Sequence, residues 1–186
     1  MASKRAVFLD RDGTINVEKD YLIDPAEFEF IPGVPEALQK LQQAGFLLVV
    51  VSNQSGVARG YFGLDDVDRL HAHMKVLLKE YGVVLAGVYI CPHHPTSGVG
   101  KYKIECDCRK GEPGMLLQAA RELDIDLPKS FMVGDKDADF QAGSAAGCSS
   151  ILVRTGHGEK WVQKAHENNV PAVADLPAAV EKILQA

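Results

Sequence analysis

The feature that most constrains the fold of this chain is a series of short, uninterrupted apolar runs separated by amphipathic stretches. Apolar residues that follow one another without polar alternation are typical of strands buried on both faces of a parallel sheet. We therefore expect five buried strands, at Ala6–Asp10, Phe46–Ser52, Gly87–Cys91, Phe131–Gly134 and Ser150–Arg154.

Helical spacing fills the gaps between these runs. The predicted helices span Val34–Ala44, Leu64–Tyr81, Pro113–Leu123, Asp137–Ala146 and Leu176–Leu184. The third opens with proline in its first turn, and the second aligns one apolar face, at Leu64, Val67, Leu70, Met74, Leu77 and Tyr81. This alternation predicts an α/β fold with a single doubly wound, Rossmann-like parallel sheet. The ligand site of such a sheet lies outside the carboxyl ends of its strands.

Length and composition limit the classes of protein to which the chain can belong. Its 186 residues suffice for a substantial core, so we expect a single domain over residues 1–186. The mild net charge of -5 argues against nucleic acid or a membrane surface as partner. No apolar run reaches the roughly 18 residues of a membrane span, and the N-terminus lacks a signal-peptide core. We expect a cytoplasmic protein, with a monomer as the default.

Acidic residues follow two of the predicted strands. The first strand runs into Asp10–Thr14 (DRDGT), and residues two apart on an extended chain point to the same side, so two carboxylates face one spot. The fourth runs into Gly134–Asp139 (GDKDAD), a cluster that would be costly to hold together without a cation. Taken alone, the first segment is also explained as a strand-end turn rich in Asp and Gly.

Other polar groups fall at the same predicted edge of the sheet. The second strand runs into Ser52–Gly56 (SNQSG), where a hydroxyl and backbone N–H groups could meet a phosphate. Lys110 precedes the helix at Pro113 and could reach the same end. Two irregular stretches, Arg11–Gly33 and Pro92–Glu112, exceed ordinary loop length, and such loops are usually functional.

Three of the four cysteines crowd one segment beside histidines, which in a reducing compartment indicates metal. Three thiolates and an imidazole complete a closed, structural tetrahedral zinc site, and we expect its ligands to be Cys91, His93, Cys106 and Cys108, with unligated cysteines as the alternative. His94 is a second choice for the imidazole. Cys148 stands apart, and we expect it to be a buried small apolar residue. His71 and His73 lie on a predicted helix, as surface or packing residues.

The motifs DxDGT, a serine after the second strand, a lysine before a helix and GDxxxD after a later strand, in this order, resemble the haloacid-dehalogenase (HAD) superfamily of aspartate-nucleophile phosphatases. The resemblance covers nearly the whole chain. It implies a magnesium-dependent phosphomonoester hydrolase in which Asp10 is the nucleophile, Asp12 is the acid/base, and Ser52 and Lys110 stabilise the phosphoryl group.

The same resemblance implies that Mg²⁺ is held by Asp10, Asp135 and the backbone carbonyl of Asp12. Asp137 and Asp139 would either orient the waters of the metal or cap the helix that begins there. Two alternatives of a different class remain: a phosphate receiver domain, which also carries an aspartate at a strand end with Mg²⁺, and a catalytically inactive binding module of the same fold. In a receiver, however, the phosphoacceptor follows a later strand.

The segments LDRDGTIN, VSNQSGVARG, ICPHHP, CDCRK and PGMLL resemble the D-glycero-D-manno-heptose-1,7-bisphosphate 7-phosphatase family of capless, zinc-containing phosphatases. That family removes the C7 phosphate on the route to nucleotide-activated heptose for lipopolysaccharide or surface glycans. Histidinol-phosphate phosphatase, whose zinc loop is typically shorter, is the close alternative. One departure from the family is Gly111-Glu112, where a proline commonly follows the lysine.

This resemblance implies a small phosphorylated sugar as substrate, and no cap domain to enclose it. The zinc loop, at about residues 91–108, leads directly into two cations, so folding around the metal would fix Arg109 and Lys110 near the active end of the sheet. Arg109 is expected to contact the remote C1 phosphate. Further substrate contacts are expected from Glu18, Lys19, Asp20, Tyr21, Asn53, Gln54, Ser55 and Lys136.

Overall fold

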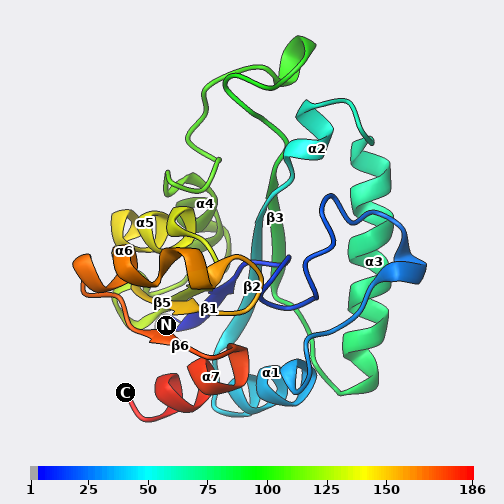
Figure 1. Ribbon diagram of the computed structural model, residues 1–186. Helices are drawn as coiled ribbons and strands as arrows, with labels where there is room; N and C mark the ends of the chain where they lie inside the picture. The colour runs from blue at the N-terminus through cyan, green and yellow to red at the C-terminus, as the bar shows by residue number, and fades with distance from the viewer. Residues whose placement is uncertain (1–3) are drawn as a thin grey trace.

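The computed structural model describes residues 4–186, and within that range six parallel strands form one sheet in the order β3-β2-β1-β4-β5-β6 (Figure 1). The strands are β1 (Ala6–Leu9), β2 (Leu47–Asn53), β3 (Gly87–Cys91), β4 (Phe131–Gly134), β5 (Ser149–Val153) and β6 (Ala172–Val173). The predicted doubly wound α/β fold is therefore confirmed, and the five predicted strands are present with ends shifted by one residue at most.

Helices connect and cover these strands. They are α1 (Val34–Gln43), α2 (Ser55–Ala58), α3 (Leu64–Glu80), α4 (Gly114–Leu123), α5 (Asp137–Ala146), α6 (Val162–Glu167) and α7 (Leu176–Leu184). Pro113 is the N-cap of α4 and not part of its first turn. The short elements β6, α2 and α6 were not predicted, because two to six residues are too few to display a hydrophobic period.

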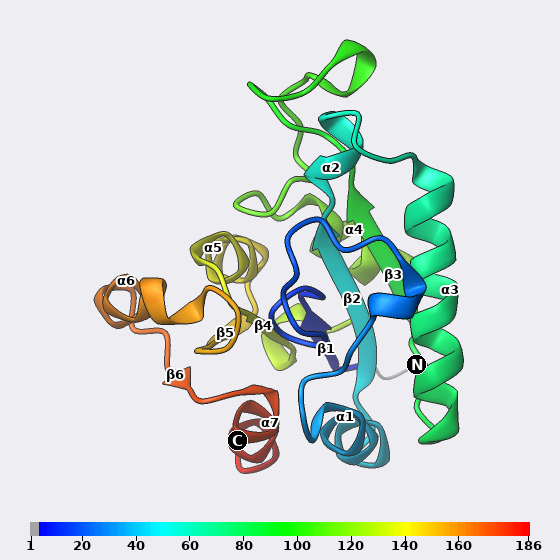
Figure 2. The same ribbon diagram turned by 45° about the vertical axis from the view of Figure 1, so that its right-hand side comes forward.

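The sheet is buried on both faces, as the unbroken apolar runs predicted. Side chains alternate along β1, so that Val7 and Leu9 join one core cluster while Ala6 and Phe8 join the other. Helices α1, α3 and α7 cover the first face, and α4 and α5 cover the second. Figures 1 and 2 show α1 and α7 packed together below the sheet. Full burial stabilises each large apolar side chain by about 1.5–3 kcal/mol.

The apolar face of α3 differs from the predicted one. Leu64 and Tyr81 lie at the two ends of the helix and are 38% and 40% exposed. Only the middle of the apolar stripe reaches the core, and the stripe includes a histidine that the prediction left out. The buried residues of the helix are Val67, Leu70, His71, Met74 and Leu78.

The sheet's winding reverses beside β1, which pairs with β2 on one side and with β4 on the other. The pairing of Leu9 with Val133 brings the ends of β1 and β4 to the same level, and the Asp10 N–H donates to the Val133 carbonyl at 2.9 Å. Such a switch point is where doubly wound sheets bind ligands. The loop after β3 rises above this end of the sheet (green in Figure 1). Within residues 4–186, no helix is both long enough and apolar enough to cross a bilayer.

Candidate active site

Three carboxylates from two strand ends meet at the switch point. Asp10 follows β1, Asp135 follows β4, and Asp139 lies in the first turn of α5; all three are buried. One oxygen of each lies within 4.8 Å of the others. Like charges this close in a dry site repel one another strongly unless cations lie between them.

Lys110 supplies one of these cations. Its Nζ lies 2.5 Å from Asp10 Oδ1 and 2.8 Å from Asp139 Oδ1, and it donates to the Val51 carbonyl at 2.8 Å. Burial works to raise the pKa of Asp10, but Lys110 and Lys136 outweigh it and leave the pKa below its usual value. Burial likewise opposes the charge of Lys110, yet the two carboxylates raise its pKa. The Asp10–Lys110 pair is therefore ionised.

Asp135 is the carboxylate that most needs a further cation. Its side chain is fully buried, Oδ2 accepts the His157 N–H at 2.8 Å, and Oδ1 has no hydrogen-bond partner among the described residues. Burial, and then the negative charge of Asp10, raise the pKa of Asp135 to about 8. Gly13 and Gly156 have positive φ, and a Cβ at either would collide with Oδ2. Lys136 Nζ lies 3.6 Å from Oδ1, too far for a hydrogen bond. A buried carboxylate oxygen that accepts no hydrogen bond fits Mg²⁺, which prefers such ligands.

Asp12 lies beside this cluster and is held by four donors. Arg11 Nη2 donates to both of its carboxylate oxygens at 2.9 Å, and Arg11 Nε reaches Oδ1 at 3.3 Å. Amides of Asn16, at 3.0 Å, and Gln54, at 3.3 Å, complete the set. Gln54 also donates to Ser52 Oγ at 2.8 Å, which ties the serine to the Asp12 network.

Arg11 and His71 are parts of the site that sequence reasoning missed. Arg11 is 0% exposed, and its Nη1 lies 3.0 Å from Nε2 of His71 on α3. Burial, and then the charge of Arg11, lower the pKa of His71 to about 3, so the imidazole is neutral and Nε2 accepts. The only signal in the sequence was the position of an arginine directly between two aspartates at the end of a buried strand.

A pocket of about 380 Å³ opens beside Asp12. Most of the predicted substrate contacts line it, namely Glu18, Asp20, Tyr21, Asn53, Gln54, Ser55, Arg109 and Lys136. Lys19 does not, because its Nζ turns away to the Glu27 carbonyl at 2.7 Å and to Glu29. His157 and Trp161 also line the pocket, although the sequence did not suggest them.

The rim of the pocket contains two residues in left-handed backbone conformations. Asp20 has φ 43° and Tyr21 has φ 57°, which costs a residue with a Cβ of order 1–3 kcal/mol. The Glu18 carboxylate accepts the Asp20 N–H at 3.1 Å, and the Tyr21 ring packs edge-on against Tyr61 at 4.9 Å. These contacts hold the loop at the pocket mouth.

The two aspartates whose roles the sequence left open are separated by the structure. Asp139 Oδ2 accepts the Lys136 N–H at 2.9 Å, so this residue caps α5 while its other oxygen pairs with Lys110. Asp137 points elsewhere: Oδ2 pairs with Lys164 at 2.6 Å, and the residue lines the pocket. Capping is therefore a role of Asp139, which also belongs to the carboxylate cluster.

The predicted zinc ligands converge. Sulfur atoms of Cys91 and Cys106 lie 3.6 Å apart, those of Cys106 and Cys108 lie 3.3 Å apart, and Nδ1 of His93 is 3.4 Å from the Cys108 sulfur. A tetrahedral zinc with Zn–S bonds of about 2.3 Å separates its ligand atoms by roughly 3.5–3.8 Å, so the cluster fits this ion. His94 is excluded from the cluster, because its Nδ1 accepts the Ser97 N–H at 2.9 Å.

The cysteine cluster adjoins the active-site cations. Arg109 Nη1 donates to the His93 carbonyl at 3.2 Å. The Lys110 N–H donates to Asn53 Oδ1 at 2.8 Å, which fastens this segment to the end of β2. These two hydrogen bonds connect the cysteine cluster to Arg109 and Lys110. A folded cysteine cluster therefore helps to fix the positions of the two cations that face the pocket.

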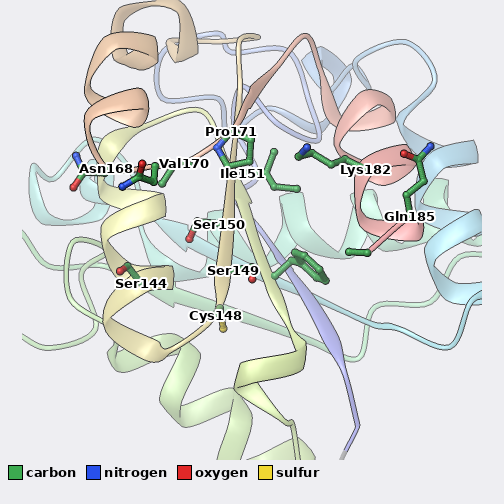
Figure 3. Close-up of a pocket in the computed structure, with 13 residues that line it drawn as sticks. Ser144, Cys148, Ser149, Ser150, Ile151, Asn168, Val170, Pro171, Lys182 and Gln185 are labelled. Carbon is green, nitrogen blue, oxygen red and sulfur yellow. The ribbon is translucent and has the colours of Figure 1, made fainter.

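A further cavity, of about 590 Å³, lies at the opposite edge of the sheet (Figure 3). It is lined by the beginnings of β4 and β5, at Phe131 and Ser149, and by the end of α7. The amino ends of parallel strands are remote from the ligand site of such a fold. Cys148 lines this cavity as a largely buried thiol, as its small-residue surroundings predicted.

Comparisons with known proteins agree with this arrangement. A family model described as HAD-hyrolase-like matches residues 107–179. The chain is 49% identical over 180 residues to the D-glycero-beta-D-manno-heptose-1,7-bisphosphate 7-phosphatase of Pasteurella multocida, covering 96% of this chain and 97% of that one. The chain belongs to this phosphatase family. The enzyme of the same name from Escherichia coli K12 is 47% identical over 182 residues, covering 95% and 94%.

Solved structures of family members superpose on nearly the whole chain. D,D-heptose 1,7-bisphosphate phosphatase from B. bronchiseptica, complexed with magnesium and phosphate, gives a TM-score of 0.86 at 37% identity, covering 97% of this chain and 98% of that one. The corresponding enzyme from Burkholderia thailandensis gives 0.74 at 30% identity, covering 98% and 100%. The protein is therefore a HAD-type phosphomonoester hydrolase.

Proposed function

We propose that this protein hydrolyses the C7 phosphate of D-glycero-β-D-manno-heptose 1,7-bisphosphate and releases the heptose 1-phosphate. The observation that carries the proposal is the pocket beside Asp12, which polar side chains and the cations Arg109, Lys110 and Lys136 line. Lys110 joins this pocket to the buried carboxylate cluster, because its Nζ pairs with Asp10. Identity of 47–52% to relatives of that name supports the substrate and its β anomer. Those names favour the heptose bisphosphate over histidinol phosphate.

The nucleophile in this proposal is Asp10. One of its oxygens is paired with Lys110, which keeps the carboxylate ionised. Attack on phosphorus gives an aspartyl phosphate, and water then hydrolyses it, so that one difficult displacement becomes two easier ones.

The proton transfers fall to Asp12. Asp12 lines the pocket, where its protonated side chain can donate a proton to the departing sugar alkoxide, and the carboxylate so formed can later accept a proton from the attacking water. General acid–base help of this kind contributes on the order of 10² to 10⁴ in rate.

Fixed positive and donor groups stabilise the transferring phosphoryl group. Lys110 Nζ pairs with Asp10, and the Ser52 hydroxyl lies near the end of β2. The protein holds both groups by hydrogen bonds before substrate arrives. Asp10, Asp135 and the Asp12 carbonyl would hold Mg²⁺, which neutralises charge on the phosphoryl oxygens when bound. Cys91, His93, Cys106 and Cys108 would hold a structural Zn²⁺.

The rest of the pocket recognises the sugar and its second phosphate. Arg109 presents a planar guanidinium suited to bidentate phosphate binding and is assigned the C1 phosphate. Lys136 and the segment Asn53–Ser55 contact the substrate, and the rim at Glu18–Tyr21 lies over the sugar. We place the protein in the cytoplasm.

The test is phosphate release across a substrate panel. We expect the highest kcat/KM for the β anomer of heptose 1,7-bisphosphate, a lower value for the α anomer, and a much lower value for histidinol phosphate. Phosphorus NMR of the product should show loss of the C7 signal with the C1 signal retained. Faster turnover of histidinol phosphate would transfer the assignment to that substrate class.

A further inference from the structure

The most unusual side chain near the site is Arg11, a permanent charge that is completely buried. It does not line the pocket, so it cannot touch a substrate there. A buried charge is costly unless it is paired and its donors are satisfied. The partners of this guanidinium are Asp12, through three donor contacts of 2.9–3.3 Å, and His71, at 3.0 Å.

The two partners lie along adjoining edges of the guanidinium. Nε and Nη2 meet the Asp12 carboxylate, while Nη1 points to Nε2 of His71, 60 residues further along the chain on α3. Because a guanidinium is planar and rigid, an acceptor fixed at Nη1 also fixes the direction of the other two nitrogens. Helix α3 packs into the core through Leu70 and Met74, so the histidine is itself immobile.

We infer that Arg11, anchored by His71, is a positioning residue that holds the Asp12 carboxylate in the orientation needed for proton transfer to the leaving group. The inference rests on the proposed function of Asp12 as acid/base. Proton transfer requires donor and acceptor within about 2.6–3.2 Å, so rotation of a carboxylate about its own bonds is enough to impair it. Asn16 and Gln54 restrain single oxygens, whereas Arg11 alone grips both.

The test uses the leaving group. An alkoxide needs a proton as it departs, whereas the nitrophenolate of p-nitrophenyl phosphate departs without one. His71→Phe keeps a ring of similar size and removes the acceptor; His71→Gln places an amide oxygen near the position of Nε2. We expect His71→Phe to lower kcat/KM for the heptose bisphosphate roughly tenfold, which is the effect expected for the loss of one hydrogen bond. The kcat/KM for p-nitrophenyl phosphate should fall by less than about threefold. His71→Gln should recover most of the loss.

The parameter kcat/KM reports the steps up to formation of the aspartyl phosphate, so the later role of Asp12 as base does not enter. A double-mutant cycle with Asp12→Asn isolates the coupling: if Arg11 and His71 act through Asp12, adding His71→Phe to Asp12→Asn should cost less than about twofold. Equal losses on both substrates, or the same tenfold loss in the Asp12→Asn background, would leave the pair a purely structural role and overturn the inference.

Arg11→Lys is the second variant, for the case in which His71→Phe fails to fold. It keeps the positive charge but loses the paired donors of the guanidinium. We again expect a larger loss of kcat/KM on the heptose bisphosphate than on p-nitrophenyl phosphate. The single variant Asp12→Asn distinguishes the proposed role of Asp12 from the positioning role of Arg11 and His71. If it shows no preference for the leaving group, the proposed role of Asp12 fails; if it shows that preference and the Arg11 and His71 variants do not, only the present inference fails.

Discussion

Lys110 Nζ lies 2.5 Å from Asp10 Oδ1, although the two residues are 100 positions apart in the sequence. The chain achieves this contact by anchoring Lys110 through its backbone: Asn53 exchanges hydrogen bonds with its N–H and its carbonyl, at 2.8 and 3.3 Å. Asn53, at the end of β2, thus holds Lys110 against Asp10 at the end of β1. The cation keeps the nucleophile charged in a site from which water is excluded. The first prediction depends on that charge.

Asp10→Asn is expected to abolish turnover while the fold is retained. A neutral amide is a poor nucleophile and adds no bulk, and the pairing of the amide oxygen with Lys110 can persist. The measurement is steady-state phosphate release with circular dichroism as the control on folding. Activity above about a thousandth of wild type would exceed what loss of a nucleophile allows and would falsify the assignment of Asp10.

The convergence of the strand-end groups could be predicted, because parallel strands fix which residues share an edge. Asp10, Asp135 and Lys110 were placed together on that ground. The contribution of His71 could not be predicted in this way, since an amphipathic pattern says which face of a helix is buried but not which loop residue the face meets. Local rules also fail at Asp20 and Tyr21, whose positive φ is stabilised by Glu18 and Tyr61 and leaves no signal in the sequence.

The second prediction concerns pH and magnesium. The pKa of Asp135 is raised from its ordinary value of 3.8 to about 8, and burial raises that of Asp139 to about 6, so the folded, metal-free protein binds these protons more tightly than the unfolded chain. This contribution to stability is fully present below about pH 4 and is lost as pH rises toward 8. We therefore expect the Tm of the metal-free protein to fall across pH 5 to 8.

Magnesium should reverse this trend. The ion binds the ionised carboxylates of the folded protein and competes with their protons, so the rise in Tm on adding Mg²⁺ should increase from pH 5 to pH 8. Asp135→Asn is the matched control, because it removes one titrating group and a metal ligand together. Its Tm should respond only weakly to Mg²⁺, and less than the wild-type Tm to pH, because Asp139 still titrates. A wild-type Tm that is indifferent to magnesium at pH 8 would contradict the site.

The third prediction is that metal loss from the cysteine cluster lowers stability, whereas metal loss from the magnesium site lowers activity. Burial raises the pKa of the Cys91 thiol, and burial raises that of Cys108 to about 11, so without a metal both thiols are protonated and the cluster loses its charge. Because the binding energy of a structural zinc is folding energy, removal of zinc should lower Tm, whereas brief EDTA treatment should remove activity reversibly through Mg²⁺.

Elemental analysis and thiol titration check that prediction. We expect one zinc per chain. The three cluster thiols should be unreactive in the folded, zinc-loaded protein, and all four thiols should react after denaturation with a chelator. Cys106→Ser should lower zinc content and Tm together, while Cys148→Ser, the matched control, should leave zinc content at the wild-type level. A folded, zinc-free protein with four reactive cysteines is the result that excludes a structural zinc.

The outline of the sheet followed from apolar runs that are long enough to be recognised. The strand β6 has two residues and the helix α2 has four, and elements of that size are set by contacts with their neighbours. At the site, the position of Lys19 is likewise decided by contacts with neighbouring residues. The resemblance to the family predicts a substrate contact there, but the carbonyl of Glu27 and the carboxylate of Glu29 hold its ammonium away from the pocket.

The last prediction concerns specificity and uses the unequal positions of two neighbouring cations. Both line the pocket, but Lys110 is buried and its Nζ pairs with Asp10, whereas Arg109 is half-buried and donates to the His93 carbonyl at 3.2 Å. Arg109 should therefore matter for a substrate that carries a second phosphate. Because a guanidinium grips phosphate through paired hydrogen bonds, Arg109→Ala should cost roughly 1.5–3 kcal/mol, about ten- to a hundredfold in kcat/KM, on the heptose 1,7-bisphosphate. Arg109→Lys keeps the positive charge but loses the paired donors of the guanidinium, so its kcat/KM should lie between those of the wild type and Arg109→Ala. On a simple monophosphate the alanine variant should match wild type, and an equal loss on both substrates would mean that Arg109 acts on the phosphoryl group being transferred.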